Sequence, residues 1–334
     1  MKNVLVTGGL GFIGTNLINS LLKKNFKVLN LDKFGYASNN FLIDHQNKNY
    51  KYIKINIAQA PQNILDSIVR KFKPEYILNL AAESHVDRSI INPFLFLNEN
   101  INLTIKILCA ALKNQRNNKN LKIIHVGTDE VYGDIDLNDK YKFNEQSKLI
   151  PNNPYSASKA SCNSIIRSFN KTYGLKTIVV NPSNNYGPFQ LPEKMIPKSI
   201  FSVFKKKPIE IYGNGKNMRN WTHVDDTVNG ILLLMKKGTV GINYNIASKE
   251  CISNIDLIKI LSAKLEDKGH KNIKIKFVKD RLGHDLKYNM TCKKLLDIGW
   301  YPQKKLDNSL NDLIDWYSYA IENKYFKLKI NDFK

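Results

Sequence analysis

The run TGGLGFIGTN at residues 7–16 constrains the fold of this chain more than any other feature. It follows a β-branched stretch and leads into a helical pattern. Its glycines at 8, 11 and 14, or at 9, 11 and 14, have the spacing of a phosphate-binding turn. Glycines are needed where a strand turns tightly into a helix and the backbone approaches a pyrophosphate. The helix N-terminus then favours an anion through its free N–H groups and partial positive charge. The run therefore predicts a dinucleotide-binding strand–turn–helix unit.

A carboxylate marks the end of the second predicted strand. Asp32 follows the glycines at about the 20-residue interval where an acid hydrogen-bonds to the adenosine ribose and repels a 2′-phosphate. This position favours NAD over NADP as the cofactor.

The order of the predicted elements indicates an α/β protein. Short β-branched runs alternate with longer helical patterns in the first half of the chain, which is typical of βαβ units. Right-handed crossovers then predict a doubly wound parallel sheet of the Rossmann type, with ligands at the carboxyl ends of the strands. We expect strands at 4–7, 27–32, 52–56, 76–81, 122–127 and 177–181, and helices at 12–24, 61–72, 93–113 and 154–173.

The character of the sequence changes after Tyr186, where Pro and Gly become frequent and the predicted strands become short. Helical patterns recur near 195–205, 224–237, 253–267 and 306–322. We therefore expect two domains: an NAD-binding Rossmann domain at 1–186, and a smaller substrate-binding lobe at 187–334.

The net charge of +22, from 51 Lys and Arg against 29 Asp and Glu, raises nucleic acid as a partner. Only six of these basic residues are Arg, and the 45 Lys are spread along the whole chain. We expect a general affinity for anions and no nucleic-acid partner.

Cysteine spacing and the first residues favour a cytoplasmic protein. The four Cys form no CxxC pair, and the His residues at 45, 125 and 270 have no acidic cluster beside them. We therefore expect neither a disulfide framework nor a bound metal. The opening MKNVLVTGGL lacks the apolar core of a signal peptide. No apolar run approaches the ~20 residues that span a bilayer, so no membrane partner is expected.

Tyr155 and Lys159 lie in NPYSASKAS at an i, i+4 spacing, which places both side chains on one face of a helix. An ammonium group near a phenol lowers the pKa of the phenol. Such a tyrosine can take a proton from a sugar hydroxyl while hydride leaves the adjacent carbon for a nicotinamide, and Lys159 can also reach the cofactor ribose. Beside a nucleotide-binding turn, the pair predicts an NAD-dependent oxidation.

GTDEVYG at 127–133 places Thr128, Asp129 and Glu130 just beyond the fifth predicted strand, on the ligand side of the sheet. Two adjacent acids beside a hydride-transfer tyrosine can supply an acid and a base for removing water, once a neighbouring ketone has acidified the C–H bond. In isolation, an Asp-Glu pair at a strand end is as often a helix start or a solvated turn.

The combination of TGGxGxxG with YxxxK resembles the extended short-chain dehydrogenase/reductase superfamily. The resemblance narrows to the dTDP-glucose 4,6-dehydratase family through TDEVYG, AAESHVDRSI at 81–90, NPSNNYGPFQLPEKMIP at 181–197, RNW at 219–221 and DRLGHD at 280–285. It covers almost the entire chain. It implies dehydration of a nucleotide-linked glucose to a 4-keto-6-deoxyglucose, with NAD returned to its oxidised form, and a homodimer formed through sheet-flanking helices.

The resemblance also implies roles for single residues. Tyr155, supported by Lys159 and Thr128, would be the base for oxidation at carbon 4. Glu130 would remove the proton at carbon 5, and Asp129 would protonate the hydroxyl leaving carbon 6. The implied NAD contacts are Gly8, Gly11, Phe12, Ile13, Gly14, Asp32, Lys33, Asn56, Ile57, Ala81, Ala82, Tyr155 and Lys159. The implied contacts to the nucleotide and diphosphate are Ser84, Asn185, Lys194, Arg219, Asn245, Arg281 and His284.

Five positions depart from the pattern of that family. Gly127 stands where a Ser is usual, and Asn56 stands where an Asp commonly contacts adenine. Gly35 and Glu99 replace hydroxyl residues near the cofactor, and Leu282 replaces a Pro. The change at Asn56 bears on NAD affinity more than on cofactor identity, and none of the five removes the acid or the base.

Three other functions are compatible with parts of the sequence. The same reaction on UDP-glucose is one, because uracil and thymine differ by one methyl group, which a pocket discriminates by only ~1–3 kcal/mol. A nucleotide-sugar 4-epimerase needs hydride transfer but no acid pair, so the Asp-Glu dipeptide argues against it. An NAD-bound regulatory or nucleic-acid-binding protein would show a clustered Lys face and degraded catalytic residues.

Overall fold

A computed structural model describes residues 2–39, 46–116 and 118–326 of the chain, so His45 lies outside the described residues. At its centre is a seven-stranded sheet in the order β10-β6-β5-β4-β1-β2-β3. Every neighbouring pair is parallel. The strands are β1 (Asn3–Thr7), β2 (Lys27–Asp32), β3 (Tyr50–Lys54), β4 (Tyr76–Asn79), β5 (Lys122–Val126), β6 (Thr177–Pro182) and β10 (Asn243–Ile246). The predicted doubly wound α/β fold is confirmed.

The two halves of the sheet diverge between β1 and β4. Strands β2 and β3 build outward on one side, and β5, β6 and β10 build outward on the other. Ligands of such sheets bind outside the carboxyl ends of the strands at this reversal. There the Thr7 hydroxyl donates a 2.7 Å hydrogen bond to Asn79 Oδ1, which ties the ends of β1 and β4 together.

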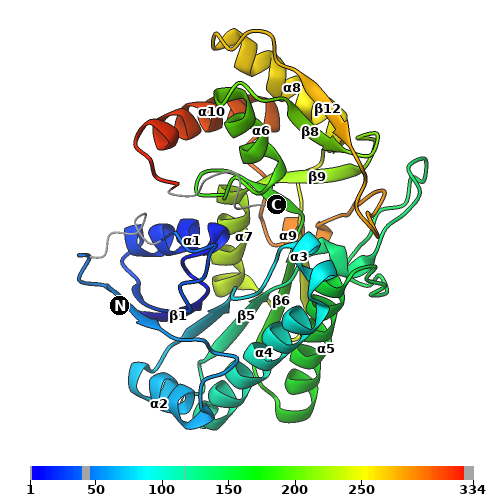
Figure 1. Cartoon of the computed structure of the whole chain (residues 1–334). Helices are drawn as coiled ribbons and strands as arrows, with labels where there is room; N and C mark the ends of the chain where they lie inside the picture. Colours follow the sequence, from blue (N-terminus) through cyan, green and yellow to red (C-terminus); the bar gives the residue numbers. More distant parts are fainter. Residues whose placement is uncertain (1, 40–45, 117, 327–334) are drawn as a thin grey trace.

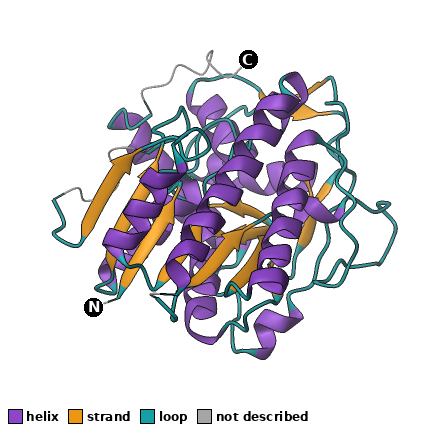
Figure 2. Ribbon diagram, turned by 90° about the horizontal axis from the view of Figure 1, so that it is seen from below, coloured by secondary structure: helices purple, strands orange, loops and turns teal. Residues whose placement is uncertain are grey.

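Helices cover both faces of the sheet. On one face α1 (Phe12–Lys23) packs beside α7 (Val224–Lys237), and on the other lie α2 (Gln62–Phe72), α4 (Pro93–Gln115) and α5 (Pro154–Tyr173), as Figure 1 and Figure 2 show. Val4 and Val6 enter the core under α1 and α7, whereas Leu5 enters the core under the other three helices. Because both faces are buried, the central strands are mostly apolar along their length instead of alternating between apolar and polar residues.

The second lobe lies over the carboxyl ends of the strands (Figure 1). It contains a three-stranded sheet, in the order β11-β9-β7, and a parallel pair of β8 and β12. A separate apolar core, which includes Tyr186, Trp221 and Tyr317, holds it together. Its elements are β7 (Asn184–Tyr186), α6 (Met195–Phe204), β8 (Ile209–Tyr212), β9 (Met218–His223), β11 (Cys251–Ser253), α8 (Asn254–Asp267), β12 (Ile275–Val278) and α10 (Leu306–Glu322).

Part of this architecture differs from what the sequence predicts. The strand expected at 52–56 is β3 at Tyr50–Lys54, and two short helices, α3 (Val86–Ile91) and α9 (Lys293–Asp297), were not expected. After residue 186 the chain returns to the first layer, because β10 pairs with β6 and α7 packs on α1. The sheet and the helices that cover it therefore include β10 and α7 from the segment at 187–334. The assignment of NAD binding to 1–186 and substrate binding to 187–334 stays a prediction.

Helix α4 is long and apolar enough to cross a membrane by length and composition, with a mean hydropathy of 1.3 over its most apolar stretch. Asn98, Glu99, Asn100 and Lys106 interrupt its apolar residues, so the helix meets this limit on its average composition and not as a single apolar run. Half of that stretch is buried inside the fold, where α4 packs against α2 and α5. A buried core helix of a soluble protein has the same properties, so this observation is weak support for a membrane span.

Candidate active site

Two adjoining cavities open at the carboxyl ends of the sheet strands. All thirteen residues expected to contact NAD line the first, which runs from the glycine turn past the ends of β2 and β3 to Tyr155 and Lys159. Six of the seven expected substrate residues line the second, between the sheet and the second lobe. Ser84 and Lys194 line both cavities.

The glycine turn is as tight as the sequence predicts. Gly8 has a φ of +67°, and a Cβ there would lie 2.6 Å from the Cα of Ala81. A Cβ on Gly14 would lie 2.4 Å from the carbonyl oxygen of Gly8. Helix α1 begins at Phe12, and the residue before it, Gly11, has no side chain to cap the first N–H groups. The turn therefore leaves backbone donors at the cavity for an anion, which fits the pyrophosphate of a dinucleotide.

Asp32 is buried at the end of β2 and fixed by the backbone around it. Its carboxylate accepts hydrogen bonds from the N–H groups of Leu10 at 3.0 Å and Phe34 at 2.8 Å, and from the Ser38 hydroxyl at 3.2 Å. The charge is held rigidly at the cavity wall, where a ribose would bring its hydroxyls.

We expect the wild-type protein to bind NAD more tightly than NADP, because Asp32 would face the 2′-phosphate of NADP across a partly buried cavity. Titration of the protein with each dinucleotide measures the two dissociation constants. Asp32→Asn keeps the shape of the side chain and should bring the two constants closer together. Equal affinity of the wild type for both dinucleotides would contradict the role given to this carboxylate.

Tyr155 and Lys159 share one face of α5, as their spacing predicts. The helix starts at a capping box in which Asn153 Oδ1 accepts the Ser156 N–H at 2.9 Å. Lys159 Nζ donates to the carbonyl oxygen of Val126 at 2.6 Å, which ties α5 to the end of β5. Both catalytic candidates are buried, and burial lowers the pKa of Lys159.

The expected lowering of the Tyr155 pKa is not found in this structure. Burial raises the pKa of Tyr155, the charge of Glu130 adds to the increase, and a hydrogen bond with Thr128 opposes it. The Lys159 ammonium does not offset burial, since it is directed at the Val126 carbonyl. The lowering of the Tyr155 pKa expected from the spacing alone was therefore wrong in direction.

The acid pair lies on a single turn of 3₁₀ helix, η1 (Asp129–Tyr132), directly after β5. Thr128 caps this turn: its Oγ1 accepts the N–H of Glu130 at 3.4 Å and donates to Asp129 Oδ1 at 3.2 Å. Asn153 Nδ2, at the start of α5, donates to Glu130 Oε2 at 3.4 Å. Glu130 lines the second cavity, whereas Thr128 and Asp129 are buried beside it.

The two acids of η1 have different electrostatic surroundings. Burial, reinforced by the charge of Glu130, raises the pKa of Asp129 to about 8, so this carboxyl group is protonated at neutral pH. Its Oδ2 is buried and has no hydrogen-bond partner among the described residues. Burial and the charge of Asp285 raise the pKa of Glu130, while Arg281 and Arg219 oppose the increase. The turn thus presents an acid next to a group that cations help to ionise.

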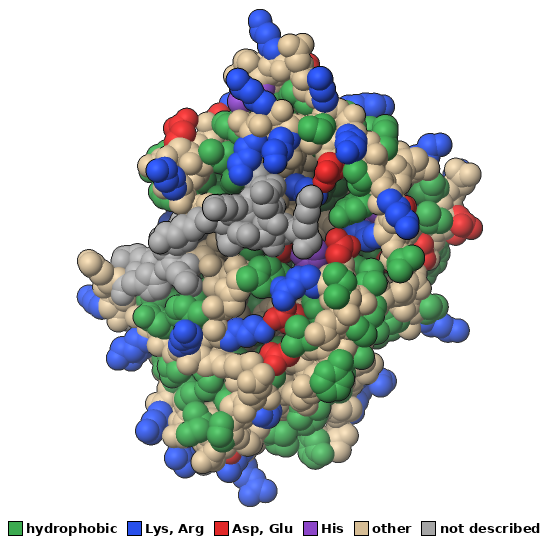
Figure 3. All heavy atoms as spheres, in the orientation of Figure 1, with side chains coloured by type: hydrophobic (Ala, Val, Ile, Leu, Met, Phe, Trp, Pro, Cys, Tyr) green, Lys and Arg blue, Asp and Glu red, His purple; other side chains and the backbone are tan. Residues whose placement is uncertain are grey.

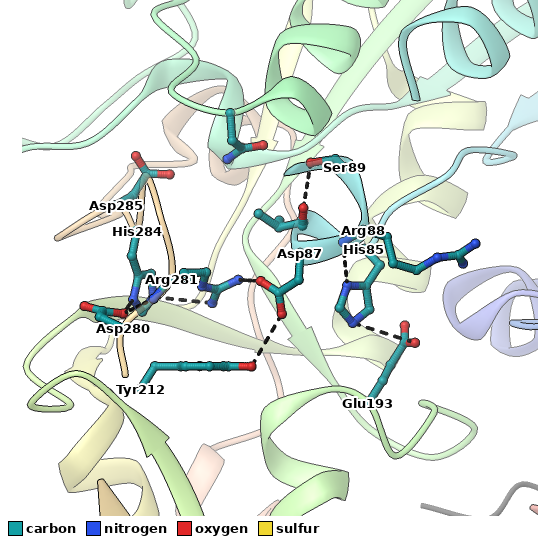
Figure 4. A network of polar contacts seen from close by, with 12 residues as sticks. His85, Asp87, Arg88, Ser89, Glu193, Tyr212, Asp280, Arg281, His284 and Asp285 are labelled. Atoms are coloured by element: carbon teal, nitrogen blue, oxygen red, sulfur yellow. Dashed lines mark hydrogen bonds and ion pairs between the residues drawn. The ribbon is translucent and has the colours of Figure 1, made fainter. Parts of the chain in front are cut away.

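The second cavity has a cationic wall at the junction of the two lobes. Figure 4 shows Arg281 pointing between Asp87 and His284. Arg281 Nη1 lies 3.5 Å from Asp87 Oδ1, and Nη2 lies 3.3 Å from His284 Nε2. Arg281 Nε is buried without a partner among the described residues. Burial, reinforced by the charge of Arg281, lowers the pKa of His284 to about 4, so this imidazole is neutral at pH 7.

The other expected substrate residues line the same cavity, with one exception. The Arg219 guanidinium stacks 4.0 Å from the ring centre of Tyr288, and its Nη2 donates to the Asp285 carbonyl oxygen at 2.7 Å. Asn185 Oδ1 is buried without a partner among the described residues. Buried polar atoms normally have a hydrogen-bond partner, so a donor group of a bound substrate would satisfy this oxygen. Asn245 lines neither cavity: it accepts from the Tyr132 hydroxyl at 2.8 Å inside the fold. The structure does not bring Asn245 to the site.

Several residues of the second cavity were not predicted individually. Asp87, Glu193 and Asp285 fall inside the quoted motifs, and the motifs were the only sequence signal for them. Tyr212 and Tyr288 also line this cavity, and no pattern in their neighbourhood indicated it. Among the described residues, no group of three or more His, Cys, Asp or Glu is placed to hold a metal ion.

The unusual Gly127 has a local explanation. A Cβ at this position would lie 2.1 Å from Asn181 Oδ1 and 3.1 Å from Asn163 Oδ1. The Asn163 amide donates to Asn181 Oδ1 at 3.0 Å, so the space beside the strand end is filled by a buried amide pair. A serine would fit here only if Asn181 moved.

Comparison with known proteins places the chain among nucleotide-sugar dehydratases. The family model described as GDP-mannose 4,6 dehydratase matches residues 5–313. A dTDP-glucose 4,6-dehydratase of Haemophilus influenzae is 38% identical over 334 residues, covering 95% of this chain and 98% of the relative. A probable dTDP-glucose 4,6-dehydratase of Sinorhizobium fredii is 37% identical over 341 residues, covering 98% and 95%. The crystal structure of a dTDP-glucose 4,6-dehydratase from Streptomyces venezuelae, with NAD and TYD bound, matches with a TM-score of 0.89 and 33% identity, covering 98% of this chain and all of that one.

Proposed function

The chain belongs to the family described as GDP-mannose 4,6 dehydratase and is a relative of the dTDP-glucose 4,6-dehydratases. From this premise, we propose how the residues of the site carry out the reaction. The protein is a hydro-lyase that dehydrates dTDP-glucose with NAD as its cofactor. One observation of this structure carries the assignment of residues. The acid pair of η1 and the Tyr155 face of α5 meet where the cofactor cavity adjoins the second cavity.

The first step is oxidation at carbon 4 of the glucosyl ring. Tyr155 accepts the proton of the carbon 4 hydroxyl, and Thr128, which hydrogen-bonds with Tyr155, positions it. NAD, when bound along the first cavity, supplies the hydride acceptor and later the hydride donor. Lys159 adds a positive charge to the lining of the first cavity, and its hydrogen bond to the Val126 carbonyl holds it at the end of β5. The resulting ketone acidifies the hydrogen on carbon 5.

The second step removes water across carbons 5 and 6. Glu130 takes the proton from carbon 5, and Asp129 donates its proton to the hydroxyl leaving carbon 6, so that water departs and a carbon–carbon double bond forms. Hydride then returns to carbon 6 and a proton returns to carbon 5. The product is the nucleotide-linked 4-keto-6-deoxyglucose. The protonated state of Asp129 at neutral pH supports its assignment as the acid.

The substrate's diphosphate is assigned to the cationic wall of the second cavity. Arg281, Arg219 and Lys194 supply the charge there, and guanidinium groups suit the paired oxygens of a diphosphate. Ser84, Asn185 and His284 add polar groups to the same cavity. In this proposal, residues 1–186 form the NAD-binding domain, which also contributes Ser84 and Asn185 to the substrate cavity, and residues 187–334 mainly bind the nucleotide-sugar.

The experiment that tests the substrate is incubation of the purified protein with dTDP-glucose and UDP-glucose separately, followed by the mass of each product. We expect loss of one water from dTDP-glucose. Faster water loss from UDP-glucose would favour the alternative nucleotide. Epimerisation without a change in mass would indicate a 4-epimerase, and the acid pair of η1 is the feature that argues against it.

The rate of dehydration should fall as the pH rises through about 8, because Asp129 then loses the proton that it must donate. The pKa of this group is raised, so the active form is present below that pH and disappears above it. A pH profile of product formation at saturating dTDP-glucose measures this alkaline fall in rate. Asp129→Asn should slow water loss by roughly 10²–10⁴-fold, and the remaining rate should no longer fall with pH in this range. A wild-type profile that is flat across this range would contradict the assignment.

We further propose a cytoplasmic homodimer with neither a membrane nor a nucleic acid as partner. The exposed apolar residues Ile91, Phe94 and Leu97, on α3 and α4, support pairing through helices that flank the sheet. The Lys and Arg side chains are scattered over the visible face in Figure 3, which supports a general solvated charge. Light scattering after gel filtration tests the dimer, and titration with duplex DNA tests the absence of binding.

A further inference from the structure

The cofactor cavity contains a lysine that is neutralised by two buried acids. Lys33 directly follows Asp32 and lines the same cavity. Its ammonium group contacts Glu83 Oε1, and it lies 3.4 Å from Glu99 Oε2. The side chains of Glu83 and Glu99 are only 8% and 9% exposed, whereas that of Lys33 is 38% exposed. Burial lowers the pKa of Lys33, but Glu83 and Glu99 outweigh it and raise the pKa above its usual value.

Glu99 is fixed on the cavity wall by donors from a different part of the chain. It projects from α4, and its Oε1 accepts from Asn56 Nδ2 at 3.4 Å and from Gln59 Nε2 at 3.2 Å. Asn56 and Glu99 both line the cavity and both depart from the family pattern. The second carboxylate oxygen faces Lys33. The acid therefore links the loop after β3 to the lysine beside the ribose-binding Asp32.

This arrangement determines whether the positive charge of Lys33 is available to bind a 2′-phosphate. A dinucleotide carrying that group needs a nearby cation, and Lys33 is the cation adjacent to Asp32. Glu83 is shared with Arg88, whose Nη1 lies 3.8 Å from Glu83 Oε2. Glu83 is therefore divided between two cations, and Glu99 is the acid that completes the neutralisation of Lys33.

We propose that Glu99 is a specificity-determining residue that disfavours NADP by neutralising Lys33, in addition to the repulsion from Asp32. The proposal rests on the proposed function, since it concerns the cofactor of that same site. It predicts that selectivity for NAD has two sources, one on β2 and one on α4. Removing the charge of Glu99 should free Lys33 to pair with the 2′-phosphate.

The test is the ratio of the dissociation constants for NADP and NAD, measured by titration calorimetry on the full chain. Glu99→Gln keeps the size of the side chain and an acceptor oxygen for Asn56 and Gln59. It should shift the ratio toward NADP by roughly ten-fold, the size expected for one partly screened charge. The shift should shrink at high ionic strength. Glu99→Thr, which removes the same charge, should shift the ratio in the same direction and serves if the first variant folds poorly.

Two further variants test whether Glu99 affects cofactor selectivity through Lys33. Asp66→Asn removes another buried acid paired with a lysine, Lys113 at 2.7 Å, but Asp66 lines neither cavity, so the ratio should stay at the wild-type value. In a Lys33→Met background, Glu99→Gln should no longer change the ratio. A shift that persists without Lys33 would overturn the proposed route.

The outcomes also separate this proposal from the proposed function. A Glu99→Gln protein that binds NAD normally, with an unchanged ratio, would overturn this proposal alone. A wild-type protein that binds neither dinucleotide would overturn the proposed function, and this proposal with it.

Discussion

Tyr155→Phe is expected to abolish the reduction of NAD by dTDP-glucose and, with it, all formation of the 4-keto-6-deoxyglucose product. Both steps fail together because water can leave only after the ketone at carbon 4 has formed. The substitution removes one hydroxyl group, and loss of a general base typically costs ~10²–10⁴-fold in rate. Single-turnover absorbance of NADH and the mass of the product measure the two steps separately.

The same variant should fold almost normally. Tyr155 is buried, and removal of its hydroxyl costs about 1 kcal/mol, which shifts Tm by only a few degrees. Tyr173→Phe is a matched control, because Tyr173 is on the same helix but 54% exposed at its far end. Turnover of Tyr155→Phe at the rate of this control would rule out the assigned role.

The raised pKa of Tyr155 shows what spacing alone could not predict. The i, i+4 pattern correctly placed Tyr155 and Lys159 on one face of α5, because helical geometry is local. The pKa depends on burial, on Glu130 of another element and on where the Lys159 ammonium points. A phenol with a raised pKa keeps its proton at neutral pH, so Tyr155 would need a positive charge beside it before it could accept a proton.

The sheet could be predicted further than the lobe that closes over it. Five of the six expected strands begin within one residue of those observed, because buried parallel strands have continuous apolar runs and are bounded by glycine turns or helices. The exception, β3, is an edge strand with mostly exposed side chains, so its limits follow from pairing with β2 and not from its own pattern. Nothing local indicated that β10 would return to the sheet.

The site residues divide in a similar way. The glycine turn, Asp32 and the acid turn lie at strand ends, and topology alone brings strand ends together. The substrate wall joins segments more than one hundred residues apart, such as Asp87 and Arg281, so only the motifs could point to it. Asn245 is the converse case, since the family resemblance implied a contact to the substrate and its packing gives it Tyr132 and the Thr291 carbonyl instead.

Glu130→Gln is expected to separate oxidation from dehydration. The variant keeps the size of the side chain and an acceptor oxygen for Asn153, but it has no base to remove the proton from carbon 5. The substitution leaves the Tyr155 hydroxyl and the cofactor cavity in place and removes a charge that raises the pKa of Tyr155, so dTDP-glucose should still reduce NAD. NADH absorbance should then accumulate together with a 4-keto-glucose intermediate that has lost no water.

The expected loss of dehydration activity in Glu130→Gln is the size that removal of a general base causes. The pH dependence of the remaining dehydration provides a second test. Water loss should fall by roughly 10²–10⁴-fold while NAD reduction proceeds, which makes the first step an internal control. The charge of Glu130 is one cause of the raised pKa of Asp129, so Glu130→Gln should also move the alkaline limb of any residual dehydration to lower pH. An epimerase would not show this separation, because it needs no base at carbon 5. Equal water loss by the wild type and Glu130→Gln, measured by product mass, would show that another group is the base.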